Sequence, residues 1–180
     1  MSTLHVENLK GLNSGGNANK IIVPSGQTLD ASNGSVNASG GLTTPAGHVI
    51  QVLSTTTDNS FGITSTSLVD TGLALTITPA STSSKILLFA NMYEVYKAST
   101  QTSPMFAISR GGTIVGDHQG ATLAWTDANQ YFNVQIQYTD SPSTTSATEY
   151  KIRFKSNNGN TVYINGDNTQ SHLTLMEIAG

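Results

Sequence analysis

A long polar connection at residues 121–131 carries the side chains best suited to contact a ligand. Trp125, the single tryptophan, is followed by Asp127, Asn129 and Tyr131. An aromatic ring can stack on the apolar face of a sugar while carboxylate and amide groups hydrogen-bond its hydroxyls. These four residues are therefore candidate contacts with a surface glycan or protein, although the simpler interpretation of Trp125 is that it closes one end of the sandwich.

Residue types that support catalysis or metal binding are scattered elsewhere. The four histidines share no ligand spacing, so no metal site is expected. Asp117 and His118 form an acid–histidine neighbour pair, but the glycines around them favour a turn. The acids are spread singly and no Gly-x-Ser-x-Gly motif occurs, which disfavours glycosidase and serine-hydrolase chemistry. We predict a protein that is not an enzyme and needs no cofactor.

The composition excludes several classes of function. Only 11% of the residues are charged, against roughly 25% in an average globular domain. The net charge is −3 and the eight Lys and Arg residues are dispersed, so a nucleic-acid-binding face is not expected. Cysteine is absent, which excludes disulfides and thiolate metal sites. Neither a membrane span nor a secretory signal is recognisable, which predicts synthesis in a cytoplasm.

From residue 46 onward, strand signals recur at short intervals with turn residues between them, and no helical period persists. An all-β sandwich is therefore predicted. Gly111-Gly112 supplies residues that tolerate positive φ, as a two-residue hairpin requires. The last strand is apolar and is expected inside a sheet. The predicted strands are 49–54, 67–73, 74–78, 85–96, 105–110, 113–116, 131–139, 149–156, 161–165 and 173–178.

The strand predicted at 85–96 is apolar on both faces. A strand with Leu87 and Phe89 on one face and other apolar side chains on the opposite face needs cover on both sides. A neighbouring copy of the chain would supply the second cover, so we expect Leu87 and Phe89 in an interface between copies. Glu94 lies in the same strand. It is an intersubunit acceptor, a partner of Lys97 or Arg110, or an exposed residue at the strand's end, and the last is the simplest interpretation.

The segment 21–41 precedes this strand-rich region and is rich in Gly, Ser and Asn. Ile22, Leu29 and Val36 are regularly spaced along it, but they are too few to form a core in one chain. The segment is therefore either a flexible leader or a stem that becomes ordered only against other copies of the chain. Several chains that bury these residues along a common axis could offset the entropy of ordering the segment, so we predict a short extended stem.

Several sequence stretches resemble tail-fibre-like virion proteins of marine and cyanobacterial bacteriophages. The start, MSTLHVENL, is similar to their attachment leader, and IIVPSGQTLD at 21–30 is similar to their stem element. The stretches HVIQV at 48–52, LVDTGL at 68–73, ITP at 77–79 and SSKIL at 83–87 resemble the opening of their C-terminal domain. That domain is similar to the trimeric jelly rolls of the complement C1q and tumour necrosis factor type.

The resemblance implies a homotrimer in which residues 1–45 form an attachment segment and stem and residues 46–180 form a jelly-roll head. The interfaces between copies would then be trimer interfaces, with Ile22, Leu29 and Val36 in the stem and Leu87 and Phe89 in the head. The expected function is that of a short trimeric tail fibre or tip on the virion exterior, bound to other virion proteins through its N-terminal segment. The alternative is a capsid decoration or cement protein. A carbohydrate-binding module and a depolymerase are less favoured.

Overall fold

The computed structural model describes residues 13–15, 22–28, 32, 45–118, 126–166 and 169–180. The chain divides into two units, Met1–Leu42 and Thr43–Gly180. In the first unit, a turn joins the backbone amide of Gln27 to the carbonyl of Pro24 at 3.0 Å. Gly26 has φ +79° at the third position of this turn, where a type II turn requires a positive φ.

The second unit is built from strands, which confirms the predicted all-β class. No helix in the described part of the chain has the length and apolar character of a membrane span. The strands are β1 (Val49–Thr57), β2 (Phe61–Ile63), β3 (Val69–Ile77), β4 (Lys85–Lys97), β5 (Pro104–Arg110), β6 (Thr113–His118), β7 (Gln130–Asp140), β8 (Thr148–Ser156), β9 (Val162–Ile164) and β10 (Ser171–Ile178).

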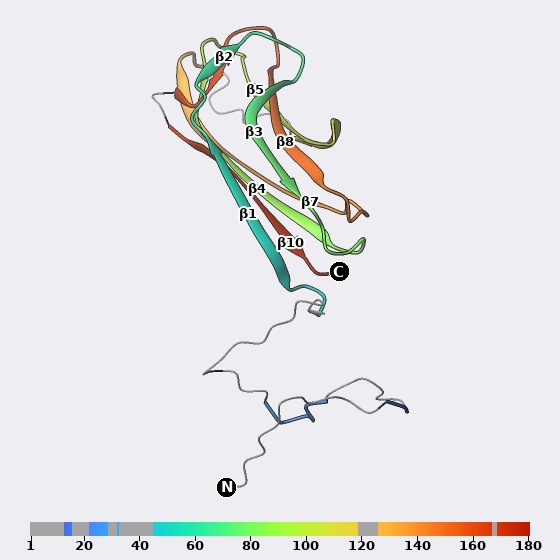
Figure 1. The fold of residues 1–180 in the computed structure, drawn as a ribbon. Helices are drawn as coiled ribbons and strands as arrows, with labels where there is room; N and C mark the ends of the chain where they lie inside the picture. The colour runs from blue at the N-terminus through green and yellow to red at the C-terminus, as the bar shows by residue number, and fades with distance from the viewer. Residues whose placement is uncertain (1–12, 16–21, 29–31, 33–44, 119–125, 167–168) are drawn as a thin grey trace. The chain divides into compact units, whose positions relative to one another are not determined.

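These strands form two packed sheets with the connectivity of a jelly roll (Figure 1). Sheet A has the order β1-β10-β4, with β7 on the far side of β4 and with β9 and then β2 continuing the sheet at the end of β4. Sheet B has the order β3-β8-β5-β6. The last strand, β10, lies between β1 and β4, as predicted for an apolar terminal strand.

The core lies between the two sheets and follows the alternation of the strands. In β7, Phe132 and Ile136 are buried while Gln135 and Gln137 are exposed. In β8, Tyr150, Ile152 and Phe154 are fully buried, and the charged residues between them face outward. Strand β4 contributes its own buried set to the same core, which consists of Ile86, Leu88, Ala90, Met92 and Val95.

The structure corrects the predicted strands in three places. The two strands expected at 67–73 and 74–78 are one strand, β3, whose pairing with β8 shifts between Asp70 and Ala74. Gly72 has φ +89° inside this irregularity. Strand β2 was not predicted, because three residues are too short for a periodic pattern. Asp117 and His118 belong to strand β6 and not to a turn.

The two ends of the sandwich are formed by different parts of the chain. Strand β1 begins beside the end of the chain, where the amide of Gly47 donates to the carbonyl of Ala179 at 2.8 Å. Strand β2 lies at the opposite end of the sandwich (Figure 1).

The predicted hairpin at Gly111 and Gly112, which joins β5 to β6, is confirmed, and both glycines have positive φ.

Candidate functional site

The outer face of sheet A carries apolar side chains that remain partly exposed. We call Val52, Leu87, Phe89, Met176 and Ile178 the apolar patch. Strand register brings them together, because Met176 of β10 pairs with Leu87 on one side and with Val52 on the other. Val52 is 52% exposed and the other four are intermediate in exposure. Leu87 and Phe89 thus lie on the face that the sequence predicted to need a second cover.

The same face carries little charge. Along β4, which runs through the middle of the sheet, charged side chains on this face occur only toward the ends, at Lys85 and Glu94. Strand β1 has no Lys, Arg, Asp or Glu. Glu177 of β10 and Asp140 of β7 are buried. Two copies of the chain could therefore meet across this face without placing like charges opposite one another.

The outer face of sheet B has the opposite character. Asp70 of β3 accepts from the Arg153 guanidinium at 2.7 Å and lies 3.7 Å from the Lys151 ammonium. Glu149 is 3.2 Å from the same ammonium. The hydrogen bond and charge of Glu149, together with the charge of Asp70, raise the pKa of Lys151. This network is typical of a face that stays in water, so the two faces of the sandwich are not equivalent.

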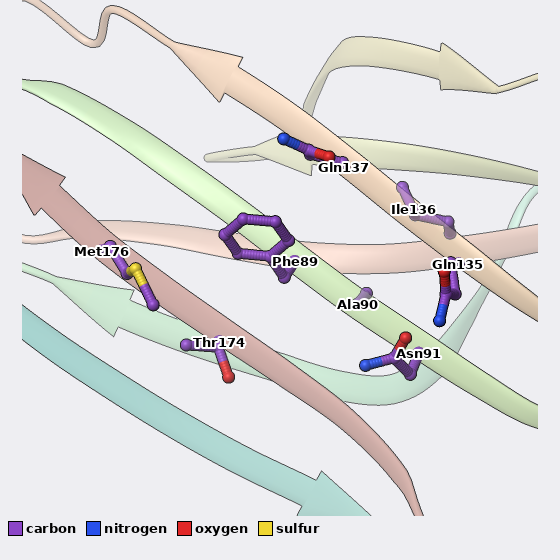
Figure 2. Close-up of a pocket in the computed structure, with 8 residues that line it drawn as sticks. All are labelled: Phe89, Ala90, Asn91, Gln135, Ile136, Gln137, Thr174 and Met176. Atoms are coloured by element: carbon purple, nitrogen blue, oxygen red, sulfur yellow. The ribbon is translucent and has the colours of Figure 1, made fainter.

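A depression of about 420 Å³ on the outer face of sheet A overlaps the apolar patch, because Phe89 and Met176 line both. Figure 2 shows Phe89 of β4 at its centre, with Met176 of β10 on one side and Gln137 of β7 on the other. Asn91, Gln135 and Thr174 line the remainder of this depression. The face thus changes from apolar to amide-rich and hydroxyl-rich along β4.

Beyond that depression, three tyrosines form a row across three adjacent strands. Tyr96 of β4 pairs in register with Tyr131 of β7 on one side and with Tyr163 of β9 on the other. Their ring centroids are 4.7 Å apart for Tyr96 and Tyr131 and 5.7 Å apart for Tyr96 and Tyr163. Tyr131 is 62% exposed and Tyr163 is 40% exposed. With Gly166, they line a pocket of about 260 Å³, which we call the tyrosine pocket.

Neighbouring residues hold these rings in place. The Tyr96 hydroxyl donates to Oδ1 of Asn129 at 2.5 Å, and Asn129 has φ +53°, which asparagine tolerates better than most residues. Asn165 is fully buried and its side-chain amide donates to the carbonyls of Thr57 and Asn59. Asn165 thereby ties the connection that contains Gly166 to the end of β1.

Glu94 lies beside the tyrosine pocket and not at an exposed strand end. Its Oε2 is buried and has no hydrogen-bond partner among the described residues. A Cβ placed at Gly166 would lie 3.0 Å from that oxygen. Glu94 also has φ +43° and its backbone amide donates to Oδ1 of Asn133 at 3.1 Å. The preferred interpretation of Glu94 from the sequence was therefore wrong.

Arg110, one partner considered for Glu94, pairs with Asp140 instead. The guanidinium lies 2.8 Å from Oδ2 of Asp140, which also accepts from the Tyr150 hydroxyl at 2.6 Å. Because β7 belongs to sheet A while β5 and β8 belong to sheet B, this cluster joins the two sheets. The hydrogen bond and charge of Asp140 raise the pKa of Arg110, and burial together with Asp140 raises the pKa of Tyr150.

The residues predicted to contact a ligand are only partly covered by the structure. Asn129 and Tyr131 both lie at the tyrosine pocket. Asp127 is exposed. Trp125 lies outside the described residues. A binding role for these four residues stays a prediction, and the sequence did not point to Tyr96 and Tyr163.

Of the predicted stem contacts, Ile22 is 54% exposed in the first unit. Leu29 and Val36 lie outside the described residues, so their place in an interface stays a prediction. In the described ranges, no group of three or more His, Cys, Asp or Glu side chains is arranged to hold a metal ion.

No protein-family model matches the chain, and a search of curated proteins finds no match. Two of the solved structures that align with this chain show a distant similarity of backbone. Latent PorU from Porphyromonas gingivalis aligns with 81% of this chain and 14% of its own, at 9% identity and a TM-score of 0.36. The VP2 subviral particle of infectious bursal disease virus aligns with 81% of this chain and 42% of its own, at 12% identity and a TM-score of 0.38. The chain thus spans less than half the length of either protein, and neither likeness carries information about function.

Proposed function

We propose that this protein is a non-enzymatic structural protein of a bacteriophage virion, which acts as a homotrimeric head of a short tail fibre or tip in attachment to the host surface. The observation that carries the proposal is the apolar patch. Leu87, Phe89 and Met176 lie at the centre of a sheet face that is free of charge between Lys85 and Glu94. Removing such side chains from water stabilises association by about 25 cal/mol per Å² of apolar area.

Other copies of the same chain are the proposed occupants of this face. Four strands about 4.8 Å apart and some eight residues long present a projected area of roughly 500 Å². Each partner of a standard interface contributes about 800 Å² of accessible area, so a face of this size is of the order that an interface requires. The number three comes from the resemblance to trimeric jelly rolls described above.

The arrangement of the two ends of the sandwich suits an attachment protein. The chain enters the head at the end where β1 begins and where Ala179 pairs with Gly47. The tyrosine pocket involves β9 and lies toward the end that carries β2. An assembly held through the residues before β1 would thus present the exposed tyrosines away from its point of attachment. Several weak contacts per trimer and several trimers per particle would then add by avidity.

Size-exclusion chromatography with light scattering on the full chain tests the proposal. Three chains of 18.9 kDa predict a particle of about 57 kDa. Leu87→Lys, which places a charge in the apolar patch, should give a folded monomer. Thr76→Lys is the matched control, because Thr76 is exposed on β3 of sheet B, and it should remain trimeric. A monomeric wild type, or a trimeric Leu87→Lys variant, would overturn the proposed assembly.

A capsid decoration protein would use the same interface, with residues 1–45 on the shell instead of the tail. Electron microscopy of virions labelled with an antibody against the head separates the two functions. Label at the tail end supports the fibre or tip, whereas label spread over the capsid supports decoration. Absence of label from virions would contradict both.

A further inference from the structure

We propose that the tyrosine pocket binds an alkylated ammonium group, such as a trimethylammonium headgroup on a host-surface molecule. The site is complete on one copy of the chain, because Tyr96, Tyr131, Tyr163, Gly166 and Glu94 all belong to the same head. It therefore goes beyond the proposed trimer and can be tested whether or not the chain self-associates.

The first support is the geometry of the rings. Tyr163, Tyr96 and Tyr131 are consecutive cross-strand neighbours, so that three electron-rich rings border one pocket. A cation within about 6 Å of a ring centroid is attracted by the negative face of that ring. The volume of about 260 Å³ lies below the ~300–1,000 Å³ of typical ligand pockets and therefore favours a small group.

The second support is the charge beside the pocket. Glu94 makes no ion pair within the described residues, and its buried Oε2 lacks a hydrogen-bond donor there. Glu94 lies next to Gly166, which is itself part of the pocket wall. A carboxylate with one of its oxygens out of contact with water attracts a nearby cation and repels an anion. The pocket should therefore reject phosphate and acidic sugars.

The third support is the backbone at Glu94. A residue other than glycine at φ +43° is uncommon, and such conformations cluster at binding sites. Here the conformation falls at the irregularity in the pairing of β4 with β7, between Met92 and Val95. It lets Glu94 lie beside Gly166 while Tyr96 keeps its register with Tyr131 and Tyr163.

The test uses choline as the probe, titrated into the full-length protein and followed by calorimetry and by tyrosine fluorescence. The neutral isostere 3,3-dimethyl-1-butanol has nearly the same shape, so it measures the share of binding that does not need a positive charge. Glucose, a neutral sugar, is the third ligand titrated. Choline should bind at millimolar concentration, at least tenfold more tightly than the neutral isostere, and glucose should not bind.

Two variants connect the binding to the pocket. Glu94→Gln removes the charge and keeps the shape, so it should weaken choline at least tenfold while the neutral isostere is unaffected. Tyr163→Ala removes one wall and should abolish binding of both. Glu149→Gln is the matched control, because Glu149 is an exposed carboxylate on sheet B, and it should bind choline like the wild type.

Three outcomes would overturn the proposal. Equal affinity for choline and 3,3-dimethyl-1-butanol would make the pocket merely apolar. Binding of glucose without choline would favour a neutral glycan instead. No binding of choline by a wild-type protein whose circular dichroism shows a folded β-protein would remove the site.

Discussion

The ring of Tyr163 lies directly over Gly62, its cross-strand partner in the pairing of β9 with β2. A Cβ at residue 62 would overlap Cε1 of that ring and lie 2.6 Å from two further ring atoms. Gly62 is therefore a positioning residue, because the absence of a side chain at this position lets the ring form one wall of the tyrosine pocket.

Gly62→Ala should move the Tyr163 ring toward solvent and open the pocket. Since the ring is 40% exposed, it can swing outward, and the free energy of unfolding should change by less than about 1 kcal/mol. Choline affinity should fall at least tenfold. Urea unfolding and calorimetric titration measure the two effects, and unchanged choline affinity would separate Tyr163 from the site.

Gly112→Ala is the control for a backbone effect. Gly112 has φ +88° in the turn between β5 and β6, where a Cβ would meet no other atom within 4 Å, and this conformation costs an alanine roughly 1–2 kcal/mol. This variant should therefore lower the free energy of unfolding and leave choline affinity unchanged. Together with Gly62→Ala, it separates loss of stability from loss of the pocket.

Tyr150→Phe should make the protein less sensitive to alkaline pH. Burial, followed by the hydrogen bond to Asp140, raises the pKa of Tyr150 above its ordinary value. The stabilisation is complete below the unfolded-state pKa of about 10 and is lost as the pH rises toward the folded-state pKa. At pH 7 the variant should lose about 1.5 kcal/mol, the value of a hydrogen bond to a charged group.

As the pH rises above about 10, the stability curves of the wild type and of Tyr150→Phe should converge. Urea unfolding at several pH values between neutral and about 11 provides the measurement. Tyr163→Phe, at a partly exposed tyrosine, should follow the wild type. Parallel curves for Tyr150→Phe would show that the buried phenol does not contribute to alkaline unfolding.

Glu177→Gln should weaken the protein at neutral pH and flatten its response to acid. Burial alone would raise the pKa of Glu177, but hydrogen bonds from the Gln51 amide at 2.6 Å and the Ala80 backbone amide at 2.7 Å outweigh it and lower the pKa. This stabilisation is present above the unfolded-state pKa of about 4.3 and is lost as the pH falls through the folded-state pKa.

Glutamine would place a donor where the buried site needs an acceptor, so the loss at pH 7 should be about 1–3 kcal/mol. Unfolding in urea at pH 7 and at about pH 3.5 should show that this loss shrinks in acid. Glu149→Gln, on the outer face of sheet B, controls for removal of a carboxylate. A constant difference between variant and wild type at both pH values would contradict the role of Glu177.

Local sequence patterns were sufficient for most of the fold. The alternation of apolar and polar residues in β7 and β8 located both strands, because one face of each packs on the core. The pair Gly111 and Gly112 identified its hairpin, because both positions require a positive φ. Strand β2 escaped prediction because it is held by its pairing with β9 and not by a pattern of its own.

The candidate site could not be predicted in the same way. Tyr96, Tyr131 and Tyr163 are distant in sequence, and only the register of three strands makes them neighbours. The burial of Glu94 depends on Gly166, which the connection between β9 and β10 brings beside it. The position of Leu87 and Phe89 on an outer sheet face, by contrast, was predictable, because a strand that is apolar on both faces shows that property locally. Their place in an interface stays a prediction.

Self-association through the apolar patch predicts that thermal stability depends on protein concentration. Binding that is specific to the folded state raises the unfolding midpoint by mass action. For a trimer of this size, a hundredfold increase in concentration should raise the midpoint by about 5 °C. Phe89→Ser, which removes the largest side chain of the patch, should abolish that dependence, and Thr76→Ser on sheet B should preserve it. An unfolding midpoint of the wild type that is independent of protein concentration would show that the heads unfold as separate monomers. In that case no neighbouring copy would cover Leu87, Phe89 and Met176, and the proposed interface would be wrong.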